Sequence, residues 1–168
     1  MRAEYSKISP KELKILNELF KNLDFLSIDN YVNSSWDVIY FHSAPFLELP
    51  IYSCIISLMN FFEEPELNIF CNPLRRNTNY LKISKPSASF EQFNSVLEEY
   101  NFTYTGGYGY SENKKFGFVS CSDIEIFSIG YEKASGIHAP DIYSNNPLVV
   151  SKDFAYKSLN EHLAFLKS

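Results

Sequence analysis

The chain has 168 residues, which suits one domain that buries roughly 70% of its unfolded surface, and its 45% hydrophobic and 17% aromatic content excludes a disordered acidic chain. Its net charge of −5 arises in one segment, since Asn22 to Leu74 has no lysine or arginine but contains Asp24, Asp29, Asp37, Glu48, Glu63, Glu64 and Glu66. Such a block attracts basic partners and repels nucleic acid, so nucleic-acid binding is not expected.

The first predicted element is a helix that begins after Ser9. Ser9 and Glu12 form a capping box, and Pro10 stands in the first turn, where its missing N–H is harmless. Helical spacing then relates the apolar residues Leu13, Leu16, Phe20 and Leu23. The β-branched and aromatic residues from Trp36 to His42 are typical of a strand, which Ala44-Pro45 ends.

The central segment from Ile51 to Phe62 is apolar at nearly every position. Periodicity does not distinguish a buried helix from two short strands there, but the length of the run favours a helix. Two short strands are predicted next, Leu67 to Cys71 and Tyr80 to Ile83. The polar connection between them, which contains Arg75-Arg76, indicates that they are antiparallel neighbours.

The C-terminal half begins with a second capped helix, Ser89 to Tyr100, whose apolar residues form one face. Strands are predicted at Phe102 to Thr105, Phe116 to Cys121 and Ile124 to Ile129, and Ser122-Asp123 joins the last two as a hairpin. After an irregular connection from Gly130 to Asn146, Ser151 caps a final helix whose apolar side holds Ala155, Leu159, Leu163 and Leu166.

These elements predict one α+β domain over residues 1–168. It contains a mostly antiparallel sheet of about six short strands packed with three to four helices, because the helices and strands do not alternate strictly. The N-terminus has no apolar leader, and the longest apolar run is too short for a membrane span. We therefore expect a soluble, cytoplasmic protein without membrane association.

The glycine cluster Gly106-Gly107-Tyr108-Gly109 lacks the features of a phosphate-binding loop. It has no following lysine with serine or threonine, and it does not match the GxGxxG turn that opens a helix. We predict a connection between strands that uses positive φ angles. The alternative is a binding loop in which Tyr104, Tyr108 and Tyr110 are interface anchors.

Histidine and cysteine residues show no metal-ligand spacing, so no metal or other cofactor is predicted. The histidines are His42, His138 and His162, and the cysteines are Cys54, Cys71 and Cys121. The cysteines are expected to be buried and unreactive. A hydrolase that pairs Cys71 or Cys121 with His138, or one that uses two carboxylates, stays an alternative because such sites assemble from distant residues.

Several acids occupy positions that oppose the helix dipole. Glu98 and Glu99 fall in the last turn of the second capped helix, and Glu63, Glu64 and Glu66 follow the predicted helix from Ile51 to Phe62. Each such charge costs about 0.3–1 kcal/mol. They are either ordinary solvated acids or acids kept in place to meet a basic partner.

With its acidic stretch WDVIYFHSAPFLELPIYSCIISLMNFFEEPELNIFCN, the chain resembles the small cytoplasmic immunity proteins of bacterial polymorphic toxin and contact-dependent inhibition systems, in size, acidity and layout. The resemblance implies a non-catalytic protein that binds a cognate toxin domain, commonly a basic nuclease, and blocks its active site or substrate path. A small hydrolase and a homodimeric scaffold module are the alternatives. The charge and tyrosine patterns select the candidate partner-binding residues Asp37, Glu48, Glu63, Glu64, Glu66, Glu98, Glu99, Tyr108 and Tyr110.

Overall fold

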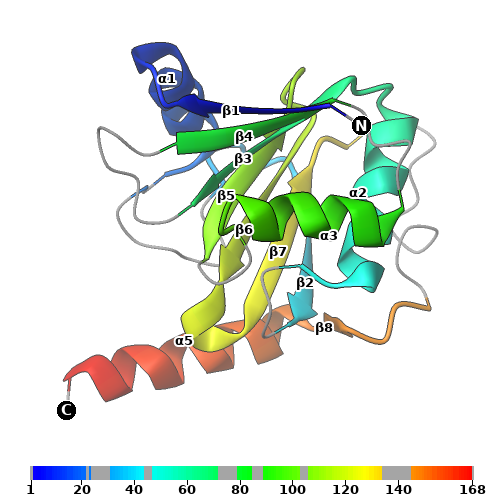
Figure 1. Ribbon diagram of the computed structural model, residues 1–168. Helices are drawn as coiled ribbons and strands as arrows, with labels where there is room; N and C mark the ends of the chain where they lie inside the picture. The colour runs from blue at the N-terminus through cyan, green and yellow to red at the C-terminus, as the bar shows by residue number, and fades with distance from the viewer. Residues whose placement is uncertain are drawn as a thin grey trace.

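The computed structural model describes residues 2–21, 23, 31–43, 47–71, 79–84, 89–102, 106–133 and 145–167. In these residues four α-helices surround one antiparallel sheet of eight strands (Figure 1), which confirms the α+β class with more strands than the six predicted. The strands are β1 Ala3–Lys7, β2 Asp37–His42, β3 Glu66–Cys71, β4 Asn79–Ser84, β5 Gly107–Ser111, β6 Phe116–Cys121, β7 Ile126–Tyr131 and β8 Val149–Val150. The helices are α1 Pro10–Leu19, α2 Leu49–Phe61, α3 Phe90–Glu99 and α5 Lys152–Lys167, with a 3-10 turn η1 at Ser122–Ile124.

The sheet order is β1-β4-β3-β5-β6-β7-β2-β8. The pairs β3–β4, β5–β6 and β6–β7 join strands that follow one another in the sequence. The edge strand β1 instead reaches β4, and β2 adds to β7 with Asp37 opposite Tyr131. The sheet is thus built from local hairpins that long-range pairings extend on both sides.

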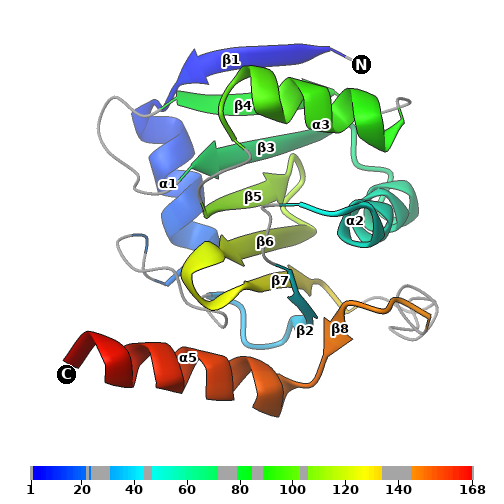
Figure 2. The ribbon, with the colours of Figure 1, turned by 60° about the horizontal axis from the view of Figure 1, so that its bottom comes forward.

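The sheet is covered on both faces. On one face, α2 and α3 pack against alternate residues of the strands, such as Ile69 in β3 and Phe118 in β6. On the other face, α1 packs against Phe70, Tyr108 and Val119. Helix α5 covers the end formed by β2 and η1, and Figure 2 shows it running along the β2–β8 side of the sheet.

Strand β5 corrects the prediction for the glycine cluster. The segment is an extended, fully buried strand with β3 on one side and β6 on the other, not a connection with positive φ. Its glycines serve close packing: a Cβ on Gly107 would lie 2.1 Å from the carbonyl oxygen of Phe70, and one on Gly109 would lie 2.1 Å from Cζ of Phe118. The alternate residues Tyr108 and Tyr110 face the α1 side.

The helix starts agree with the sequence. Ser9 and Glu12 make the predicted capping box, and the hydroxyls of Ser89 and Ser151 accept hydrogen bonds from the N–H groups of Gln92 and Phe154. The ambiguous apolar segment is helix α2, as its length favoured. Of the predicted strands, those that begin at Trp36, Leu67, Tyr80 and Phe116 are confirmed as β2, β3, β4 and β6.

Other boundaries differ from the prediction. The hairpin between β6 and β7 exists, but η1 occupies Ser122–Ile124, so β7 begins at Ile126. Phe102 is not in a strand, because its N–H bonds to the carbonyl of Leu97 and completes the end of α3. The rest of that predicted strand, residues 103–105, lies outside the described residues, as do Asp24, Asp29, Ala44-Pro45, Arg75-Arg76 and His138.

We expect Gly109→Ala to lower the free energy of unfolding by about 1–3 kcal/mol, because the added methyl group overpacks against the Phe118 ring. Denaturant unfolding of the single mutant measures this. The double mutant G109A/F118L is the control, since a shorter side chain at 118 makes room for the methyl. A double-mutant cycle without favourable coupling would contradict the steric role of Gly109.

Candidate partner-binding surface

Helices α2 and α3 form one layer over the sheet. The ring of Tyr52 in α2 lies with its centroid 5.5 Å from that of Phe90 and 4.8 Å from that of Phe93, both in α3. Ile55 and Leu58 of α2 and Leu97 of α3 are buried in the shared core. The two helices thus pack on the same face of the sheet and contact each other near the start of α3 (Figure 1).

This layer has no basic side chain. The described residues 47–64 and 89–102 contain no lysine, arginine or histidine. We call the acids that they expose or half-expose the acidic layer: Glu48, Glu63, Glu91, Glu98 and Glu99. No described residue forms an ion pair with any of the five. The charge of the layer is thus uncompensated within this part of the chain.

Both helices end in the same Schellman geometry. At the end of α2, the N–H of Glu64 bonds to the carbonyl of Met59 and that of Glu63 to Asn60, with Glu63 at a φ of 54°. At the end of α3, Phe102 and Asn101 make the equivalent bonds, with Asn101 at a φ of 60°. Glycine or asparagine is usual at this left-handed position, so glutamate at 63 has a conformational cost.

The last turns also place negative charge at the negative end of each helix dipole. Glu98 and Glu99 end α3, as predicted, and Glu63 follows α2 directly. Among the described residues, the one hydrogen bond to these three carboxylates is 2.8 Å long and runs from Asn94 Nδ2 to Glu98 Oε1. Helix stability therefore does not explain why these residues are acidic.

Apolar side chains are exposed beside the acids. Leu49 at the start of α2 is 53% exposed and Phe61 at its end is 44% exposed. Phe61 stands edge-on to Phe62, with 5.1 Å between the ring centroids. Acids next to exposed apolar groups are typical of a protein-binding surface, where apolar contacts supply affinity and charges direct the approach.

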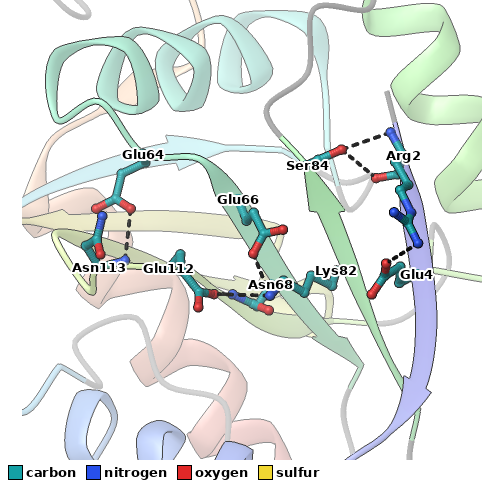
Figure 3. Close-up of polar contacts among 9 residues, drawn as sticks. All are labelled: Arg2, Glu4, Glu64, Glu66, Asn68, Lys82, Ser84, Glu112 and Asn113. Carbon is teal, nitrogen blue, oxygen red and sulfur yellow. Dashed lines mark hydrogen bonds and ion pairs between the residues drawn. The ribbon is translucent and has the colours of Figure 1, made fainter.

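A second group of acids lies on the opposite face of the sheet, but its charge is largely paired (Figure 3). Lys82 of β4 stands 2.5 Å from Glu66 Oε2 and 3.7 Å from Glu112 Oε2. The side chain of Asn68 donates to the same Glu112 oxygen. The hydrogen bond to Glu66 is the main cause that raises the pKa of Lys82, so this lysine stays cationic. Internal pairing makes this cluster the weaker candidate for binding a basic partner.

Three predicted partner-binding residues are not on the surface. Tyr108 is fully buried and Tyr110 is 3% exposed, because both belong to β5 under α1 and not to a loop. Burial raises the pKa of Tyr110, and the carboxylates of Glu12 and Glu112 add to the effect. Glu64 is fully buried beneath the β5–β6 turn, where its Oε2 accepts from the backbone N–H of Asn113. These residues are corrected to structural roles.

The remaining candidates separate by position. Glu48, Glu63, Glu98 and Glu99 are exposed or half-exposed at the ends of α2 and α3. Asp37 begins β2 and forms an ion pair with Lys133 at 3.1 Å, and Glu66 belongs to the paired cluster around Lys82. The sequence missed the exposed Leu49 and Phe61, because α2 is so apolar that no periodicity separates its outer positions from its core positions.

The cysteines and histidines do not form a site in the described residues. Burial raises the pKa of the Cys54 thiol to about 12 and that of Cys121 to about 11, the opposite of what a nucleophilic cysteine needs. His42, at the end of β2 as predicted, contacts Glu125 at 3.2 Å. No group of three potential metal ligands occurs in these parts of the chain, and no described helix is long and apolar enough to cross a membrane.

Comparison of the chain with protein-family models, with curated proteins and with solved structures gave no match.

Replacing Glu63 by glycine should raise the free energy of unfolding by about 0.5–1 kcal/mol, because glycine adopts the left-handed conformation without steric cost. Chemical denaturation is the measurement. Glu63→Gln is the matched control, since it removes the charge but keeps the side chain. Asn101→Gly, at the equivalent position after α3, should gain less, because asparagine already tolerates this conformation. Equal gains at 63 and 101 would contradict the assigned strain.

The double mutant E98Q/E99Q should melt at a higher temperature than the wild type. It removes two charges from the negative end of α3, each worth about 0.3–1 kcal/mol at low salt, while the amide oxygen introduced at position 98 still accepts from Asn94. Melting at low and high ionic strength checks this, because salt should reduce the gain. A double mutant that melts lower would show that these acids stabilise the free protein.

Proposed function

We propose that this protein is a non-catalytic inhibitor of the immunity type, which binds a basic toxin domain through the acidic layer. The observation that carries the proposal is the absence of any basic residue in described residues 47–64 and 89–102, together with exposed acids and apolar groups there. Acids that destabilise the helix ends are expected where binding, rather than stability, determines the residue type.

The charge of the layer suits a partner that binds nucleic acid. A nuclease presents cationic residues to the phosphates of its substrate. A surface with several carboxylates and no cation attracts the same residues and competes with the substrate for them. Exposed Leu49 and Phe61 would supply the apolar contacts of such a complex. Inhibition by occupation of the substrate path requires no catalytic residue in this chain, and a cytoplasmic location fits that role.

The test uses the protein domain encoded by the reading frame next to this gene. We expect a heterodimer whose association rate, measured by stopped flow, falls about tenfold or more between 0.1 M and 1 M salt, because the Debye length shrinks from about 10 Å to 3 Å. E98Q/E99Q should associate more slowly than the wild type. The control D153N/E161Q removes two exposed charges from α5 and should keep the wild-type rate.

A complex that does not form, an association rate that ignores salt, or equal slowing by both double mutants would contradict the proposal. An unrelated basic protein of similar size, such as lysozyme, should bind much more weakly than the neighbouring domain. Growth of cells that co-express the domain with the wild type or with E98Q/E99Q gives an independent measure of neutralisation.

A further inference from the structure

A groove lies at the β2–β8 edge of the sheet. It has a volume of about 440 Å³, and its lining comes from three separate parts of the chain, at residues 21, 31–40 and 149–152. We call it the edge groove. Its charge differs from that of the acidic layer, so it calls for a different ligand.

Two neighbouring aromatic rings belong to the lining of the edge groove. The hydroxyl of Tyr31 donates to the carbonyl of Ser128 at 2.8 Å, which fixes the ring over β7. The Trp36 ring lies beside it, with 5.9 Å between the centroids. Gly130 leaves room for both, since a Cβ there would lie 3.0 Å from each ring. A hydrogen bond and close packing on Gly130 thus hold this part of the lining in place.

One backbone position of β2 is open along the groove. Strand β8 pairs only with Tyr40 and Phe41, although β2 begins at Asp37. The N–H of His42 bonds to Leu148 on the β8 side, so by the two-residue period of a strand the N–H and C=O of Val38 also face that side. Beyond the end of β8, no described residue bonds to them. Val38 thus offers a free donor and a free acceptor within the groove lining.

The described lining of the groove carries two lysines and one aspartate. Lys21 and Lys152 line the groove, and the one acid among its described lining residues, Asp37, is paired with Lys133 at 3.1 Å. No described residue forms an ion pair with the exposed Lys21. In a protein with a net charge of −5, this concentrates cationic groups beside an open strand edge.

We propose that the edge groove binds a short extended peptide segment that carries an acidic side chain. The peptide pairs antiparallel with β2 and exchanges two backbone hydrogen bonds with Val38, continuing the line of β8. A carboxylate of the peptide reaches Lys21, and an alternate apolar side chain lies against Trp36. The inference is independent of the proposed function, because it concerns another part of the sheet and a ligand of opposite charge.

Trp36 is the only tryptophan of the chain, so its fluorescence reports on the groove directly. The probes are the peptides acetyl-Glu-Val-Glu-Val-amide and acetyl-Lys-Val-Lys-Val-amide, titrated up to millimolar concentration. We expect a saturable change with the acidic peptide and none with the basic one. Lys21→Glu, a substitution at an exposed position, should weaken binding by at least about tenfold.

The backbone contact has its own test in Val38→Pro. Proline removes the N–H that faces the open edge but no hydrogen bond of the β2–β7 ladder, so the variant should fold and lose peptide binding. Val38→Ala, which keeps the N–H, should retain binding, and E98Q/E99Q should bind as the wild type does. Far-ultraviolet circular dichroism checks the fold of each variant.

Four outcomes would overturn the proposal. Two concern the peptides: no saturable fluorescence change with the acidic peptide, or equal binding of the basic peptide. Two concern the variants: unchanged peptide binding by K21E and V38P, or unfolding of V38P. Unfolding of V38P would show that the Val38 N–H takes part in the β2–β7 ladder. Succinate, a dicarboxylate without a peptide backbone, should not compete. Competition by succinate at the peptide's own concentration range would overturn the backbone contact and reduce the groove to a site for small anions.

Discussion

Every residue of the three central strands β5, β6 and β7 is buried, so this sheet has no solvent face at its centre. An antiparallel sheet can leave one face in water, but a strand buried on both sides needs cover from two layers. The α2–α3 layer supplies one cover, and α1 with the Tyr31–Trp36 segment supplies the other. The acidic layer belongs to the α2–α3 cover, and the edge groove lies beside the Tyr31–Trp36 segment of the other cover.

The same constraint separates the charges. Helix α2 presents apolar side chains to the sheet at so many positions that its charged neighbours lie at its ends, at Glu48 and Glu63. The cations of the described residues lie outside the α2–α3 cover, for example on α1, on the β5–β6 turn and on α5, where several pair with carboxylates. The cover formed by α2 and α3 thus carries acids without cations in its described residues, whereas acids and cations occur together on the α1 side.

The sequence predicted the elements whose signals, such as caps and residue patterns, lie within the element itself. Serine caps and helical spacing located three helix starts, and runs of β-branched and aromatic residues located β2, β3, β4 and β6. Strand β1 was not predicted, because its polar sequence is extended only through pairing with β4. Strand β5 was mistaken for a connection, although Gly107-Tyr108-Gly109-Tyr110 alternates with the period of a strand. The glycine side of that alternation is filled by Phe118 of the neighbouring strand, which sequence order does not reveal.

For the candidate sites too, the sequence predicted what depends on local position and missed what depends on distant segments. Positions counted from a helix end, such as Glu98 and Glu99, were placed correctly on the surface. Glu63 and Glu64 are adjacent, yet the left-handed turn at Glu63 sends one outward and the other into the core. The edge groove was not predicted, because it needs three distant segments and a strand, β8, of only two residues.

The strand order also sets how the molecule assembles. The β3–β4 and β5–β6–β7 hairpins close short stretches of chain, whereas β2 pairs with β7 from the other half of the sequence. Closing a long loop costs more chain entropy, so the pairing of β2 with β7 carries a larger entropic cost than the closure of any of these hairpins. Helix α2 follows β2 and leads into β3, and thus links this long-range pairing to the β3–β4 hairpin. The groove beside β2 therefore exists only where this long-range pairing is made, and opening of that edge of the sheet removes it.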